Sequence, residues 1–79
     1  MAWREVTLGD TRWNVSLVAE RVSPASRWRL MLSFRPSSRE RRPVWAPYPL
    51  ESSSRSALFT LADRIPNDTL AALLAQRSG

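Results

Sequence analysis

Two stretches of this chain alternate between apolar and polar positions, and this period of two most restricts what the chain can fold into. In 13–20 every odd position is apolar, beginning with Trp13. In 28–35 the even positions Trp28, Leu30, Leu32 and Phe34 are apolar. A two-residue period rich in β-branched and aromatic side chains is typical of a strand with one buried face. The chain is therefore expected to build an antiparallel sheet.

The first hairpin is predicted from its turn. A short strand over 3–8 precedes Gly9 and Asp10, a two-residue turn in which glycine takes the positive φ. This turn sets Val6 opposite Trp13, so the apolar residues of both strands share one face. Turn chemistry and hydrophobic pattern therefore predict the same register.

The second hairpin is expected to turn through 23–26. That loop sets Val22 opposite Arg27 and brings the apolar faces of the two strands together. On the other face Glu20 meets Arg29, an opposite-charge cross-strand pair worth ~0.2–1 kcal/mol.

A fourth extended segment covers 43–49 and contains three prolines. Because proline lacks a ladder donor, this segment is predicted to be an edge strand or a polyproline-like arm. The direction in which Trp45 points stays open, since the length of the preceding loop is not defined by the pattern.

The remaining chain predicts two helical segments, at about 53–65 and 67–77. A serine cluster supplies the N-cap of the first, and Pro66 ends it. Asn67 or Asp68 is expected to cap the second. The first segment carries an apolar stripe at helical spacing, formed by Leu58, Leu61, Ala62 and Ile65.

These elements predict one α+β domain over 1–79: an antiparallel meander of three to four strands, followed by two C-terminal helical segments packed on one face. The sheet is expected over about 3–49. The predicted core comprises Val6, Leu8, Trp13, Val15, Leu17, Trp28, Leu30, Leu32 and Phe34, covered by Leu58, Leu61, Ile65, Leu70 and Leu73.

The residue types that most enzyme chemistry needs are missing. The chain has no cysteine, histidine or lysine, which removes disulfides, thiolate and imidazole metal ligands, imidazole bases and Schiff-base lysines. Its seven carboxylates show no spacing typical of an acid–base pair or a calcium loop. The sequence therefore predicts a protein without catalytic activity, metal or cofactor. No apolar run approaches the ~20 residues of a membrane span, and the expected location is the cytoplasm.

The sheet face that points away from the predicted helices carries a small apolar group with a basic rim. The registers place Trp3 near Val18 and Met31. The surrounding charges are Arg27, Arg29 and Arg35. Because Trp, Met and Arg are enriched in protein interfaces, this face is expected to bind an unknown protein partner or a second copy of the chain. In the alternative interpretation Trp3 folds over an edge or end of the sheet, and Val18 and Met31 are scattered surface apolar residues.

Nucleic-acid binding is the alternative function. Twelve arginines against seven carboxylates give a net charge of +5, which attracts polyanions. Single-strand binders combine such charge with aromatic side chains on which bases stack. The additional contacts in that interpretation are Arg12, Arg39, Arg41, Arg42 and Trp45.

Overall fold

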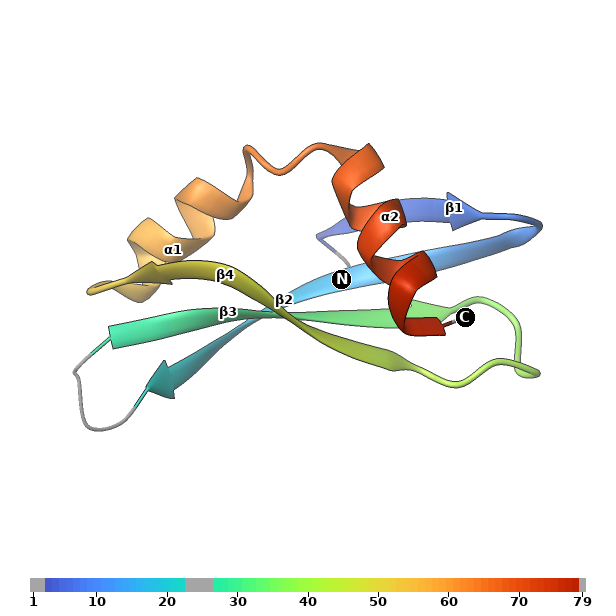
Figure 1. The fold of residues 1–79 in the computed structure, drawn as a ribbon, viewed down its shortest axis with the longest axis horizontal. Coiled ribbons are helices and arrows are strands. Elements are labelled where there is room, and N and C mark those ends of the chain that lie inside the picture. Colours follow the sequence, from blue (N-terminus) through green and yellow to red (C-terminus); the bar gives the residue numbers. More distant parts are fainter. Residues whose placement is uncertain (1–2, 23–26, 79) are drawn as a thin grey trace.

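The computed structural model describes residues 3–22 and 27–78, which form four strands and two helices (Figure 1). The elements are β1 (Arg4–Leu8), β2 (Thr11–Val22), β3 (Arg27–Pro36), β4 (Val44–Ser52), α1 (Arg55–Ala62) and α2 (Asn67–Ser78). The strands pair antiparallel in the spatial order β1-β2-β3-β4. The predicted α+β class and the meander are confirmed.

Both hairpin registers match the expectation from sequence. Gly9 has φ 61°, and the turn sets Val6 opposite Trp13. In the second hairpin Val22 pairs with Arg27. The predicted loop at 23–26 lies outside the described residues. A shift of one residue in either hairpin would move all the apolar side chains of a strand from the core to the solvent face. The alternating pattern therefore strongly specifies the strand pairing.

The proline-rich segment forms β4, an edge strand that pairs only with β3. Its register shifts between Arg29 and Leu30, where Leu30 pairs with Tyr48 and Arg29 with Glu51. The strand thus carries a bulge, which an edge position tolerates together with prolines. The edge-strand prediction is confirmed, although β4 runs three residues beyond the predicted end.

Helix α1 begins as predicted and ends earlier. The Ser54 side chain caps it by accepting the N–H of Ala57 at 3.3 Å. The predicted end near Ile65 is wrong, because the helix stops at Ala62. Ile65 N–H donates to the Ala62 carbonyl in a tighter turn, as expected just before a proline, which disfavours helical geometry in the residue preceding it.

Helix α2 begins at Asn67. The prediction that Asn67 or Asp68 caps this helix is therefore wrong, because the cap residue precedes the helix. The preceding Pro66 provides the first helical carbonyl, which accepts the N–H of Leu70 at 3.3 Å. The Asn67 side chain instead accepts a hydrogen bond from Arg4 of β1. This contact fixes the start of α2 against the first strand.

The core lies between one face of the sheet and the two helices (Figure 1). Leu61 is wrongly predicted as core, since 38% of it is exposed. The buried line on α1 runs through Leu58 and Ala62, and Leu61 lies to one side of it. The fully or nearly buried residues are Val6, Trp13, Val15, Leu30, Leu32, Phe34, Ala46, Leu58, Ala62, Ile65, Leu70 and Leu74. Four predicted core residues, Leu8, Leu17, Trp28 and Leu73, are only partly buried.

Candidate interaction surface

The sheet face opposite the helices, here called the outer face, has no described element covering it (Figure 1). Its centre is a cross-strand row in which Val18 pairs with Met31, and Met31 with Pro47. The neighbouring row contains Ser33 and Trp45. We call Val18, Met31, Trp45 and Pro47 the Trp45 patch. Three strands bring these residues together because alternate side chains of paired strands share one face.

The structure assigns Trp45 to the outer face, a direction that the sequence left open. Its pairing partner Ser33 and the buried Ala46–Leu32 pair beside it put Trp45 on the side away from the core. Trp45 is 53% exposed, more than any other large apolar residue of the described chain. Such a side chain gains the most from being covered by a partner.

Trp3 lies elsewhere than predicted. Its N–H donates to the Val15 carbonyl, while Arg4 is the register partner of the same Val15. Two successive residues then face one, the arrangement of a β-bulge, and the extra residue reverses the alternation of sides. The indole packs beside the core, and its Nε1 donates to Asp63 just after α1 at 2.8 Å. The prediction that Trp3 joins Val18 and Met31 on the outer face is therefore wrong, whereas Val18 and Met31 do pair there.

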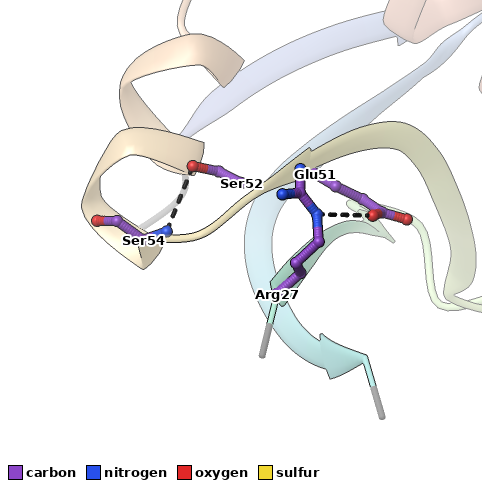
Figure 2. Close-up of polar contacts among 4 residues, drawn as sticks. All are labelled: Arg27, Glu51, Ser52 and Ser54. Atoms are coloured by element: carbon purple, nitrogen blue, oxygen red, sulfur yellow. Dashed lines mark hydrogen bonds and ion pairs between the residues drawn. The ribbon is translucent and has the colours of Figure 1, made fainter. Parts of the chain in front are cut away.

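Two of the three predicted rim arginines form ion pairs with carboxylates on the same sheet. The Nη2 of Arg29 lies 2.9 Å from Glu20, the predicted cross-strand pair. The Nε of Arg27 lies 3.3 Å from Glu51, as Figure 2 shows at the end of β4. In the same view the N–H of Ser54 donates to the Ser52 hydroxyl. These carboxylates reduce the positive charge available to an incoming ligand.

The third rim arginine, Arg35, lies toward the opposite end of the outer face, together with Arg12 of the alternative nucleic-acid set. Arg12 is 3.9 Å from Glu5. Arg35 is exposed and pairs in register with Asn14. The face thus holds four arginines against three carboxylates, which makes it close to neutral. Exposed pairs of this kind contribute little to stability, but they lower the local potential.

The remaining predicted basic residues lie in the connection between β3 and β4. Arg39, Arg41 and Arg42 are all exposed there. A short turn positions them, in which the Ser38 hydroxyl accepts the N–H of Glu40 at 3.2 Å. Because β4 begins two residues after Arg42, this loop lies at the same end of the sheet as Trp45.

No protein-family model, curated protein or solved structure matches this chain.

An open cleft of about 400 Å³ lies on the helix side of the sheet and was not predicted from sequence. Its walls come from the start of the chain, the middle of β2 and the end of α1. The lining residues are Trp3, Ser16, Leu17, Phe59, Thr60 and Asp63. Residues about sixty positions apart meet here, so no local pattern could have indicated the cleft.

Within 3–22 and 27–78, no group of three or more acidic side chains is placed to hold a metal ion. In the same part of the chain, neither helix has the length and apolar character needed to cross a bilayer.

Proposed function

We propose that this chain is a small non-catalytic interaction module that recognises another protein through the Trp45 patch. The observation that carries the proposal is an uncovered sheet face with a 53% exposed tryptophan beside Met31, Val18 and Pro47. Aromatic and methionine side chains surrounded by arginine are the composition of interface hot spots. The proposed mechanism is surface recognition, in which a partner's apolar side chains cover Trp45.

The charges around the patch support a protein partner. Arg27 and Arg29 each have a carboxylate neighbour within 3.3 Å. A phosphate group binding here would have to displace those carboxylates or tolerate their repulsion. A protein surface with charges of both signs can instead exchange ion pairs with this rim, which favours specificity.

Single-strand nucleic-acid binding is a second candidate, supported by one observation. Arg39, Arg41 and Arg42 are exposed near Trp45, and no carboxylate within 4.0 Å pairs with them among the described residues. An exposed indole next to unpaired arginines could stack a base while the arginines contact phosphates. This arrangement uses the loop rather than the arginines of the outer face.

Differential capture tests the proposed function. Wild-type protein and the Trp45→Ser variant are immobilised side by side and exposed to the same cell extract, treated with nuclease. We expect proteins held by the wild type to be retained at least about thirtyfold less by Trp45→Ser, the effect of losing a hot-spot residue. Met31→Asp should act in the same way.

The matched control is Leu61→Ser, which removes an exposed apolar side chain from the helix layer instead of the sheet. It should retain the partners of the wild type. Equal retention of partners by wild type and Trp45→Ser would contradict the proposal. So would loss of those partners in Leu61→Ser but not in Trp45→Ser.

A further inference from the structure

The edge of the sheet at β2 is only partly covered. β2 has twelve residues, and β1 pairs with five of them, Thr11 to Val15. The other seven, Ser16–Val22, have no neighbouring described strand on that side. A strand with an uncovered edge presents unpaired amide and carbonyl groups, which can pair with another chain.

The hydrogen-bonding pattern identifies which groups point to the open edge. The Arg12 carbonyl accepts the N–H of Ser37 after β3, so the even residues of β2 direct their backbone groups toward β3. The odd residues Leu17, Ala19 and Arg21 therefore direct theirs outward. None of these three forms a backbone hydrogen bond on that side within 3–22 and 27–78.

The opposite edge of the sheet is protected and this one is not. β4 carries Pro47 and Pro49, which have no N–H to offer, and a bulge near them interrupts the ladder. The open part of β2 contains no proline and no register shift. Strand addition to this sheet is therefore favoured at β2.

The open edge adjoins the cleft described above. Leu17, whose backbone N–H and C=O point to the open edge, lines the cleft together with Trp3 and Asp63. One oxygen of the Asp63 carboxylate accepts the Trp3 indole N–H. The nearby Arg4 guanidinium is bound to the backbone carbonyls of Asp63 and Ile65, not to this carboxylate. The cleft thus offers a carboxylate that forms no ion pair among the described residues, next to the Trp3 ring, over which the Arg4 guanidinium lies at 4.2 Å from the ring centre.

We propose that a second copy of this chain occupies this edge, with the two β2 strands pairing antiparallel about a two-fold axis at Ala19. This register uses the whole open segment, because Ser16 then meets Val22 of the partner subunit. Leu17 pairs with the partner's Arg21, and the reciprocal pair forms on the other side of the axis. The outward groups of the three odd residues give about six backbone hydrogen bonds between the copies.

Charge complementarity in the cleft supports a second copy as the occupant. Leu17 and Arg21 lie on the same face of β2, the face that carries the helices. Pairing Leu17 with the partner's Arg21 therefore brings that guanidinium over the cleft, within reach of Asp63 and the Trp3 ring. Arg21 is exposed within its own chain, where its guanidinium lies 5.8 Å from the centre of the Trp28 ring and forms no ion pair among the described residues. The same two contacts occur twice in the dimer, as two-fold symmetry requires.

This inference does not depend on the proposed function, since it uses the edge of the sheet and the cleft, whereas the Trp45 patch lies on the outer face. The two can be tested with different variants. A dimer that forms without Trp45-dependent capture would support the edge pairing and contradict the proposed function. Trp45-dependent capture by a monomeric protein would do the opposite.

The experiment is a charge exchange, measured as molecular mass in solution over a range of concentrations. At the highest protein concentrations of this range, the wild type should have the mass of a dimer, twice that of one chain. Arg21→Asp places two carboxylates in each cleft, and Asp63→Arg places two guanidinium groups there. Each variant alone should dimerise about a hundredfold more weakly, because like charges in an interface are strongly unfavourable.

An equimolar mixture of the two variants should recover the dimer. In one cleft of the mixed pair, the native Arg21 of one chain meets the native Asp63 of the other. In the second cleft the two substituted side chains, an aspartate and an arginine, meet with their charges exchanged. A monomeric wild type would overturn the proposal, and so would a mixture that stays monomeric while the wild type dimerises.

A second variant keeps the test valid if Asp63→Arg fails to fold after losing its bond to Trp3. Ala19→Pro removes an amide that points outward and has no intramolecular acceptor in the described chain, so the fold is expected to persist. This variant should be monomeric with an unchanged circular dichroism spectrum. A folded Ala19→Pro protein that still dimerises like the wild type would overturn the proposal.

Discussion

Single side chains in this small protein connect segments that are distant in the sequence. Arg4 is the clearest case, since its guanidinium donates to the carbonyls of Asp63 and Ile65 and to the side chain of Asn67. It also lies 4.2 Å from the centre of the Trp3 ring. One arginine of β1 thus provides partners for carbonyls in the turn between the helices, which the helices cannot satisfy themselves.

Replacement of Arg4 should therefore destabilise the fold. We expect Arg4→Ala to lower the free energy of unfolding by about 2 kcal/mol, the range for hydrogen bonds made by a charged group. In a domain of this length that corresponds to a fall in Tm of about 8–16 °C. Arg4→Lys should not restore stability, because an ammonium group cannot reproduce the planar fork of donors.

Thermal unfolding measures this effect, with Arg64→Ala as the control. Arg64 is an exposed arginine near the same turn, and its substitution should change Tm by only a few degrees. Equal stability of Arg4→Lys and wild type would contradict the role assigned to the guanidinium.

The strands show how far the sequence determines this fold. Alternation and turn chemistry were sufficient to predict both hairpin registers residue by residue. Trp3 was misplaced because a period-two pattern does not reveal where an extra residue enters a strand. Leu61 was misplaced because its spacing fits the stripe, whereas the short α1 buries only the line through Leu58 and Ala62. The direction of Trp45 required the β3–β4 register, which proline-rich sequence does not specify.

The open edge of β2 makes a prediction about amide exchange along one strand. The amides of Ser16, Val18 and Glu20 point to β3 and should exchange slowly at every protein concentration. The amides of Leu17, Ala19 and Arg21 should exchange rapidly in dilute solution, because they point outward.

At concentrations where the dimer forms, the outward amides should slow by at least about tenfold, since they become bonded to the second copy. Hydrogen exchange observed by NMR resolves the individual residues. Protection of all six amides in a monomeric sample, or rapid exchange of the outward amides in a dimer, would contradict the proposed edge pairing.

The whole molecule is elongated for its size. Its radius of gyration is 12.9 Å, compared with about 11.6 Å for a compact domain of this length, and its longest extent is 39 Å. Two short helices cover one face of a twisted sheet and leave the outer face and part of the β2 edge free (Figure 1). A small domain that buries a limited fraction of its surface has much to gain from association. The uncovered surfaces are accordingly where partners are expected.

These uncovered surfaces are proposed to recognise protein rather than nucleic acid. The most direct test is a titration of fluorescent single-stranded and duplex oligonucleotides at low and physiological salt, with Arg39→Ala/Arg41→Ala/Arg42→Ala as the comparison. Because three of the four outer-face arginines have a carboxylate neighbour, which leaves mainly the three loop arginines to contact phosphates, we predict a Kd above about 100 µM at physiological salt, the weak end of nonspecific binding. Micromolar or tighter binding that weakens steeply with salt and is lost in the triple variant would contradict the account and assign the Trp45 patch and the arginine loop to nucleic acid.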